Sequence, residues 1–169
     1  SLKSICDIGG GQGSFLTQLL TNYPHIKGIV ADLQGSVQSA EKVIAKANLN
    51  NRCKAIPFDF LKDSPPICDA YFLVNVLHDW EDDVCSQILK NISKSMIQDS
   101  KLWIVEYLLE PGSGFSVAKL LDLEVLVMGS GRERSLDEYK ILLGSVGLCV
   151  STVTPTNHGP DMIECTIVQ

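Results

Sequence analysis

Residues 3–13, KSICDIGGGQG, place a short apolar segment directly before a turn built largely from glycine. The apolar residues favour a buried strand, and the glycines let the backbone turn tightly and let a ligand come close to the main chain. The segment that follows, 14–23, repeats apolar side chains at the spacing of one helix face. A strand, a glycine turn and a helix in this order predict the first β–α unit of a sheet, with a ligand site where the strand ends.

The same alternation continues along the chain. Further strands are expected at 27–32, 53–60, 69–77 and 101–109, and helices at 36–49, 82–96, 117–128 and 135–147. At the last helix, Ser135 and Glu138 form the pattern of a capping box, and Gly147 suits a helix stop. Strands separated by helices indicate right-handed crossovers and a parallel sheet that is covered on both faces.

Two closing strands, 148–156 and 161–169, are separated by the turn-like sequence NHGP, residues 157–160. Strands joined by so short a turn must run antiparallel to each other. We therefore predict an α/β fold, with a Rossmann-like, mostly parallel sheet of seven strands that ends in an antiparallel hairpin.

The composition is that of an ordinary globular protein of one domain, with 169 residues, of which 45% are hydrophobic and 20% charged. A net charge of −6 argues against a general surface for nucleic acid or for an anionic membrane. No apolar run reaches the ~18 residues that a bilayer span requires. The first residues do not resemble a signal peptide, so we expect a cytoplasmic protein.

Six cysteines are scattered through the chain without a C-x-x-C pair: Cys6, Cys53, Cys68, Cys85, Cys149 and Cys165. Several lie in apolar runs, which is typical of reduced, buried thiols. Histidine and cysteine never occur at ligand spacing, so a zinc site is not expected.

The glycine turn departs from the dinucleotide-binding fingerprint G-x-G-x-x-G. Position 14 is serine, so the pattern is G-x-G-x-G across Gly9, Gly11 and Gly13. A dinucleotide loop offers N–H groups to a pyrophosphate, whereas a ligand without phosphate, such as S-adenosylmethionine, mainly needs room. Asp32, at the end of the second strand, suits the ribose hydroxyls of either kind of cofactor, or else a charge at a helix N-terminus.

A second polar position follows the third strand. Asp59 lies between Phe58 and Phe60, where the sheet is expected to open onto the cofactor. A carboxylate there suits the amino group of an adenine while an aromatic ring packs on the base. A loop aspartate between two core aromatics gives the same pattern, so both interpretations stay open on these residues alone.

The fourth strand runs into YFLVNVLHDWEDD, residues 71–83, where an apolar run stops at His78 and then turns acidic. At a buried strand end, the imidazole of His78 suits a base, a ligand or a packing residue. We interpret Asp79 and Trp80 as structural and residues 81–83 as charges that are favourable at a helix N-terminus.

Six segments occur together in the order typical of one family: DIGGGQG (7–13), ADL (31–33), FDF (58–60), VLHDWEDD (76–83), IVEYLL (104–109) and GSGRERSLDEY (129–139). The chain resembles the catalytic domain of the S-adenosylmethionine-dependent small-molecule O-methyltransferases. These include plant caffeate and flavonoid O-methyltransferases, acetylserotonin O-methyltransferase and bacterial polyketide O-methyltransferases. The resemblance implies a class I methyltransferase sheet and one S-adenosylmethionine-binding catalytic domain over residues 1–169.

The resemblance assigns the general base to His78, supported by Glu106 at the end of the fifth strand and by Glu133. It implies methyl transfer from S-adenosylmethionine, leaving S-adenosylhomocysteine, to a hydroxyl of a small aromatic or polyketide-type molecule, and we expect this hydroxyl to be phenolic. At an ordinary pKa of about 6.5, His78 would be largely neutral at pH 7 and able to accept the proton. This route requires no metal.

The resemblance also assigns residues to the cofactor: the turn from Gly9 through Gly11 to Gly13 to its methionine portion, Asp32 to the ribose, and Asp59 and Phe60 to the adenine region. Asp7, Leu33 and Asn75 complete the predicted cofactor-binding set, with Asn75 as an uncharged hydrogen-bond donor. The family often has glycine where this chain has Phe58, which would tighten the adenine pocket. It often has lysine or arginine where this chain has Val74 and Asn75.

In the family, an N-terminal helical domain dimerises and closes the substrate pocket, and this chain, which begins almost on a strand, has no counterpart of it. A homodimer is therefore expected only if the native protein contains such a domain. Two other functions stay open. One is a non-catalytic S-adenosylmethionine-binding module or inactive fragment of such an enzyme. The other is an NAD-dependent oxidoreductase, which the G-x-G-x-G spacing and the closing hairpin disfavour.

Overall fold

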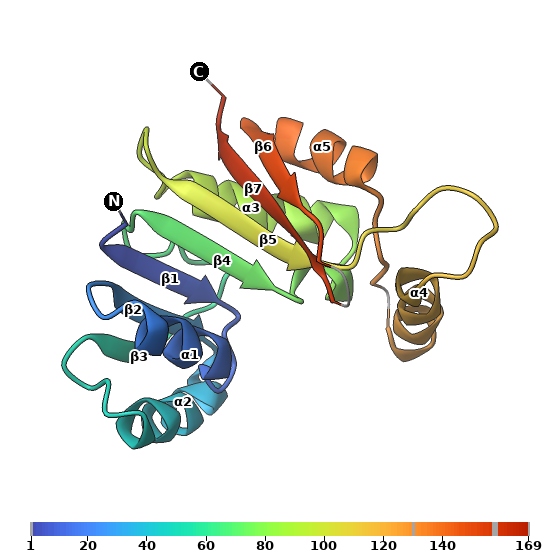
Figure 1. The fold of residues 1–169 in the computed structure, drawn as a ribbon. Coiled ribbons are helices and arrows are strands. Elements are labelled where there is room, and N and C mark those ends of the chain that lie inside the picture. The colour runs from blue at the N-terminus through green and yellow to red at the C-terminus, as the bar shows by residue number, and fades with distance from the viewer. Residues whose placement is uncertain (1, 130, 157–158, 169) are drawn as a thin grey trace.

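A seven-stranded sheet organises the chain in the computed structural model, which describes residues 2–129, 131–156 and 159–168 (Figure 1). Its strands are β1 (Ser4–Ile8), β2 (Lys27–Asp32), β3 (Cys53–Pro57), β4 (Ala70–Val74), β5 (Lys101–Glu106), β6 (Leu148–Thr154) and β7 (Asp161–Ile167). They lie in the order β3-β2-β1-β4-β5-β7-β6. The first five are parallel, and β7 is antiparallel to both of its neighbours. The predicted fold class is confirmed.

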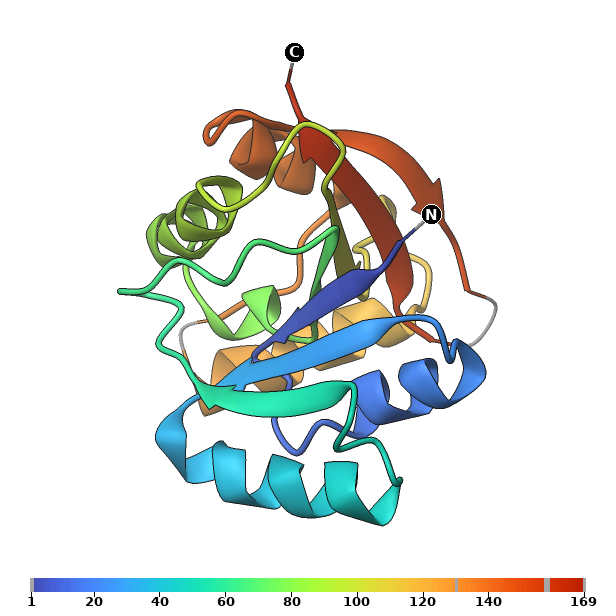
Figure 2. The ribbon, with the colours of Figure 1, turned by 90° about the vertical axis from the view of Figure 1, so that its left-hand side faces the viewer.

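The helices are α1 (Ser14–Asn22), α2 (Gln34–Lys46), α3 (Asp82–Ser93), α4 (Val117–Met128) and α5 (Leu136–Gly144), with a short 3-10 turn, η1 (Leu77–Asp79). One apolar core joins α1 and α2 to the sheet, and another joins α3 and α5 to its opposite face. Figure 2 shows these two helix layers with the sheet between them. In contrast, α4 lies beyond the carboxyl ends of β4 and β5 (Figure 1).

The core packing follows the apolar spacing of the helices. Leu16 and Leu20 of α1 are fully buried beside Ile5 of β1, whereas Ile88 and Leu89 of α3 are buried on the other face. Burying such side chains contributes about 1.5–3 kcal/mol each relative to exposure. A sheet that is apolar on both faces therefore leaves its polar residues at the strand ends, where the site is built.

The third and fourth strands end before the residues expected. β3 stops at Pro57 rather than at residue 60, because Asp59 begins a turn in which its carbonyl accepts hydrogen bonds from the N–H groups of Lys62 and Asp63. β4 stops at Val74 rather than at residue 77, because Asn75 takes a left-handed conformation with φ of 51°. His78 therefore lies on a 3-10 turn beyond the strand.

The last strands are also shorter than expected, because each strand ends where its partner ends. β5 stops at Glu106, opposite the first residue of β7, rather than at residue 109. β6 and β7 stop at Thr154 and Ile167 instead of residues 156 and 169. Within the expected turn at 157–160, residues 157 and 158 lie outside the described part of the chain, as does residue 169.

The start of α5 is as predicted. Ser135 is the N-cap, its side chain accepts a hydrogen bond from the N–H of Glu138, and the Glu138 carboxylate accepts one from the N–H of Ser135. The helix ends at Gly144, before Gly147, which is left-handed with φ of 76°. Several other expected helices shift by two or three residues at an end, for example 82–96, which ends at Ser93.

All six cysteines are free thiols, and all but Cys149 are buried. This agrees with the interpretation of reduced, core-forming cysteines. Among the helices of the described ranges, none combines the length and apolar character that crossing a membrane would require.

Candidate active site

His78 is carried by a turn that begins immediately after β4. The left-handed Asn75 directs the chain out of the sheet, and its N–H donates to the carbonyl of Val105 over 3.0 Å. The 3-10 turn then places His78 at the edge of the sheet with about a fifth of its side chain exposed. The carboxyl end of a parallel strand is where ligands of open α/β sheets bind.

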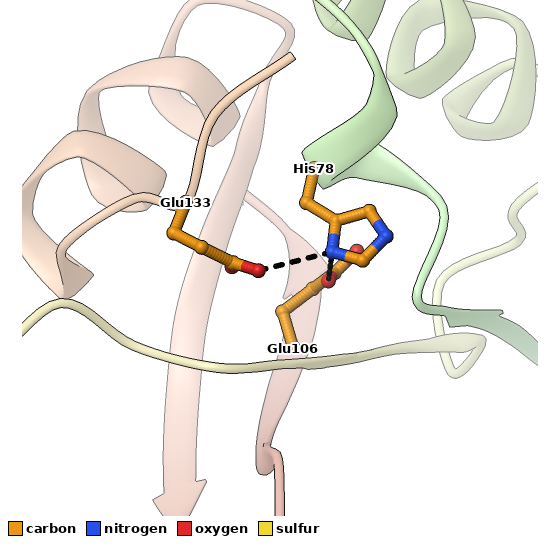
Figure 3. Close-up of side chains that lie close together, drawn as sticks. All are labelled: His78, Glu106 and Glu133. Atoms are coloured by element: carbon orange, nitrogen blue, oxygen red, sulfur yellow. Dashed lines mark hydrogen bonds and ion pairs between the residues drawn. The ribbon is translucent and has the colours of Figure 1, made fainter. Parts of the chain in front are cut away.

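Two buried carboxylates meet one edge of the His78 ring (Figure 3). Nδ1 lies 3.1 Å from Oε1 of Glu133 and 3.5 Å from Oε2 of Glu106, and both glutamate side chains are fully buried. Glu106 is the last residue of β5, and Glu133 follows α4. The structure therefore brings together the three residues predicted for catalysis, although 55 positions separate His78 from Glu133.

The other ring nitrogen faces away from the glutamates. Figure 3 shows Nε2 on the far side of the ring, where it lies 3.4 Å from Oδ1 of the largely exposed Asp79. Asp79 also lines a cavity of about 240 Å³, together with Val125 of α4, Gly129 and Gly131. Nε2 is thus the ring nitrogen that the two glutamates leave unoccupied, on the side of Asp79.

Each glutamate is held by hydrogen bonds that involve a main-chain N–H. Oε1 of Glu106 accepts hydrogen bonds from the N–H groups of Val76 (2.9 Å) and Leu77 (2.8 Å). The N–H of Glu133 donates to Oδ1 of Asp122 on α4 over 2.9 Å. Within the described part of the chain, Oε2 of neither glutamate makes a hydrogen bond. The oxygens beside the imidazole are Oε1 of Glu133 and Oε2 of Glu106, and their negative charge stabilises its positive charge.

The hydrogen bond to Glu133 raises the pKa of His78 to about 8, aided by the charges of Glu106 and Asp79 and opposed by burial. At pH 7 about one tenth of the imidazole is then neutral. The expectation of a largely neutral His78 at pH 7 is therefore wrong, because the ordinary value ignores two carboxylates that only the fold brings near. Burial likewise raises the pKa of Glu106 to about 7.

The same three side chains offer one imidazole nitrogen and two carboxylate oxygens that lie within 4.8 Å of one another, close enough for a metal ion. A proton shared between the imidazole and Glu133 accounts for the arrangement equally well. A reaction without a metal stays a prediction.

The glycine turn fits a ligand that lies against the backbone. Gly9 has φ of 71°, and a Cβ there would lie 2.9 Å from Cγ2 of Val76, so a larger residue would not fit. Gly11 has φ of 55°, and within the described chain nothing lies within 4 Å of the Cβ position. The turn therefore borders open space at Gly11, whereas Gly9 is closely packed against Val76.

Asp32 closes this turn from the second strand. Its Oδ2 accepts the N–H of Gly11 and its Oδ1 accepts that of Leu33, both over 2.7 Å. Each carboxylate oxygen has a second lone pair available to a ribose hydroxyl, and the Leu33 side chain beside it is exposed. These positions suit the predicted ribose site.

Asp7 lies beneath the turn and is only 1% exposed. A Cβ at Gly10 would lie 2.5 Å from its Oδ2, and neither oxygen makes a hydrogen bond to the residues that the structure describes. Burial, with a contribution from the charge of Asp32, raises the pKa of Asp7 to about 7. Asp7 therefore packs against the inside of the glycine turn, and its predicted contact with the cofactor stays a prediction.

The residues predicted for the adenine region lie around the same edge. Asp59 pairs with Lys62 over 2.6 Å, which lowers its pKa. Phe60 meets Trp80 edge to face, with ring centroids 5.8 Å apart. Asn75 exposes its side chain at the end of β4. Phe58 is buried in the core, and its expected effect on the adenine pocket stays a prediction.

Sequence reasoning missed Arg134. The R-E-R tripeptide has the composition of an exposed charge cluster, yet Arg134 is fully buried and donates hydrogen bonds to the carbonyls of Leu77 and Trp80. Gly131 was missed as well, and its Cα lies against the backbone of His78 and Asp79. No periodicity or spacing in the sequence signals either contact.

A family model described as the O-methyltransferase domain matches residues 1–149. The phenazine O-methyltransferase PhzM of Lysobacter antibioticus is 36% identical over 162 residues, which cover 96% of this chain and 48% of the relative. The 8-amino-8-demethylriboflavin N,N-dimethyltransferase of Streptomyces davaonensis is 34% identical over 161 residues, covering 94% of this chain and 46% of the relative. The chain thus spans about half the length of these relatives.

Solved structures agree. An O-methyltransferase of neocarzinostatin biosynthesis, in complex with S-adenosylmethionine and 2-hydroxy-5-methyl naphthoic acid, superimposes with a TM-score of 0.90 and 29% identity over 99% of this chain and 49% of that one. The family uses S-adenosylmethionine. The match therefore excludes the alternative function as an NAD-dependent oxidoreductase. The arrangement of the sheet, the glycine turn and the sequence likeness together place this chain in the O-methyltransferase family.

Proposed function

We propose that the chain is the catalytic part of an enzyme that transfers a methyl group from S-adenosylmethionine to a phenolic hydroxyl of a small aromatic or polyketide-type molecule, with His78 as the general base. One observation carries the proposal: Nδ1 of His78 faces two buried carboxylates, while Nε2 is directed away from them, beside Asp79, which lines a cavity next to α4. An imidazole held in this way has one nitrogen fixed by its partners and the other available to a substrate.

The cofactor fits the glycine turn. Gly9 and Gly11 would accept its methionine portion against the backbone, and Asp32, with Leu33 beside it, would accept the ribose hydroxyls. Asp59, Phe60 and Asn75 would lie around the adenine. Asp7, beneath the glycine turn, completes the proposed set of cofactor residues. When bound, S-adenosylmethionine supplies a methyl group activated by a positively charged sulfur.

His78 would remove the phenolic proton. Its Nδ1–H donates to Glu133, which leaves the Nε2 lone pair facing the hydroxyl. The proton moves from the phenol oxygen to Nε2, and Glu106 and Glu133 stabilise the resulting imidazolium. A phenol has a pKa near 10, so such a base contributes about 10²–10⁴-fold at neutral pH. Alignment of the acceptor oxygen contributes further by removing the cost of orientation.

An amine acceptor is a second candidate, because one relative is named as an N,N-dimethyltransferase. An amine with a lone pair attacks without prior deprotonation, so His78 would remove the proton only as the new bond forms. Replacing His78 would then slow the reaction less than for a phenol. A non-catalytic cofactor-binding module, the third candidate, would bind the cofactor and methylate nothing.

Several finer assignments are also proposals. The net charge of −6 suits neither nucleic acid nor an anionic membrane as a partner, so we propose a cytoplasmic enzyme whose partner is its small-molecule substrate. A homodimer is proposed only for a native protein that carries a further helical domain.

Calorimetry and product analysis test the proposal on the full-length protein. S-adenosylhomocysteine should bind, and S-adenosylmethionine with a panel of hydroxylated naphthoic acids and phenols should give a product heavier by one methyl group. Saturating EDTA should leave the rate unchanged. Cofactor binding without a product from any phenol or amine of the panel supports the non-catalytic module instead.

A further inference from the structure

Arg134 is the largest side chain that the described residues bury completely. A guanidinium carries a permanent charge and five N–H donors, so its burial requires a partner of opposite charge and several acceptors. Asp82 at the start of α3 provides the charge, with its Oδ1 2.8 Å from Nη2 and 2.9 Å from Nε. The remaining N–H donors of Arg134 are directed to main-chain carbonyls.

These donors hold the turn that carries the base. Nη1 of Arg134 donates to the carbonyl of Leu77 over 2.9 Å, and Nη2 donates to that of Trp80 over 2.7 Å. One of these carbonyls precedes His78 by one residue and the other follows it by two. The planar fork of a guanidinium fixes the spacing of two acceptors, which an ammonium group cannot do.

Glu106 holds the same turn from the other side. Its Oε1 accepts the N–H of Leu77, while the carbonyl of Leu77 accepts from Arg134. Both polar groups of residue 77 are therefore bound to buried charges of opposite sign. The position of the His78 ring is set by this pair of contacts as well as by its own hydrogen bond to Glu133.

The chain around Arg134 contacts the base at two further points. Glu133, the preceding residue, binds Nδ1 of His78. At Gly131, a Cβ would lie 2.0 Å from the carbonyl oxygen of His78, so the two backbones are packed directly together. We propose that Arg134, with Gly131, is a positioning residue that fixes the turn at Leu77–Trp80 so that His78 meets Glu133.

This inference rests on the proposed role of His78 as the base. A positioning role and a simple contribution to stability predict changes of opposite sign in the pKa of His78. Loss of a nearby positive charge, with no movement of the turn, would raise the pKa of His78. Loss of the Glu133 contact through movement of the turn would lower it, because that contact is the largest cause of its raised value.

The test is a titration of ¹³C-labelled histidine by NMR in the full-length protein, with the His78 signal identified by its loss in His78→Gln. In Arg134→Met, the midpoint should fall from about 8 toward 6.5. Arg134→Lys keeps the charge but loses the fork, and it should give an intermediate value. Arg132→Met is the matched control, because Arg132 pairs with Asp82 and Glu138 rather than with the turn.

Gly131→Ala tests the same inference without removing a charge. Its Cβ should separate the two backbones and lower the His78 midpoint, whereas Gly129→Ala should leave it near 8, because nothing described lies within 4 Å of that Cβ. This pair decides the question if Arg134→Met does not fold. A midpoint that stays near 8 or rises in folded Arg134→Met, or in Gly131→Ala, would overturn the inference.

The titration does not depend on turnover. A protein that shows these shifts but methylates no acceptor contradicts the proposed function and leaves the positioning role intact. A protein that methylates a phenol through His78, with the midpoint unmoved in the variants, contradicts the positioning role alone.

Discussion

Nδ1 of His78 lies 3.1 Å from Oε1 of Glu133, and this distance sets the protonation state of the ring at neutral pH. The carboxylate favours a proton on Nδ1 in both forms of the imidazole. Nε2 is then the nitrogen that gains and loses a proton during the reaction.

The rate should increase with pH through a midpoint of about 8. His78 accepts a proton only when neutral, and Glu133, Glu106 and Asp79 favour its protonated form. Measurement of kcat/KM for a phenolic acceptor between pH 6 and 10 should show this midpoint. A rate that is already at its maximum at pH 6.5 contradicts the raised pKa.

His78→Gln should lower kcat for a phenol by about 10²–10⁴-fold and leave the affinity for S-adenosylhomocysteine unchanged. The ring contacts the two glutamates and not the glycine turn, so cofactor binding does not depend on it. His25→Gln is the control, since His25 is exposed in the turn between α1 and β2. Unchanged turnover in His78→Gln removes this residue as the base.

Glu133→Gln should shift the pH dependence of the rate toward lower pH. The amide oxygen can still accept the Nδ1–H bond, but the negative charge that favours the imidazolium is lost. The midpoint of kcat/KM should therefore move from about 8 toward 6.5. If the midpoint stays in place while the rate falls, Glu133 acts through orientation alone.

Asp32→Ala should weaken S-adenosylhomocysteine binding by about 10–100-fold, the effect of losing one charge-assisted hydrogen bond of about 1.5–3 kcal/mol. The substitution also frees the N–H groups of Gly11 and Leu33. Calorimetry measures the change, with the exposed Asp99→Ala as control. Equal affinities in the two variants would contradict the ribose site.

Asp7 should make the protein less stable as pH rises from about 4 to 7. Its pKa rises from 3.8 to about 7 on folding, so the folded state binds more protons in this window, and stability falls as they are lost. Asp7→Asn should therefore increase the free energy of unfolding at pH 8, by on the order of 4 kcal/mol at most, and change it little near pH 4.

Thermal unfolding at the two pH values checks this prediction. Asp137→Asn serves as its control, because Asp137 is largely exposed and pairs only with Lys140 in the described chain. A destabilised Asp7→Asn at pH 8 would show that the carboxylate finds a favourable partner in the folded protein.

The sequence predicted the alternation of strands and helices well, because the periods of apolar side chains report burial on each face of an element. It misplaced strand ends at residues 60, 77 and 109, because a strand ends where its partner ends or where a residue such as Asn75 leaves the sheet. Neither the end of a partner strand nor the point at which the chain leaves the sheet is visible in the local pattern of apolar residues.

The assignment of His78 as the base, and of the two glutamates beside it, came from the family resemblance rather than from spacing. Their contact depends on β4, β5 and the segment after α4 meeting at one edge of the sheet. The raised pKa of His78 and the burial of Arg134 could not be predicted, since both depend on residues more than 25 positions away.

The N–H of Glu133 donates a hydrogen bond to Asp122, which lies on one side of α4. Its inner side anchors the backbone next to the base, while Leu120, Leu123 and Val127 point outward and are exposed. Exchange of these outer side chains would change the contacts of α4 without disturbing the proton acceptor. Substitutions on the outer side of α4 should therefore leave the contact between Glu133 and His78 in place.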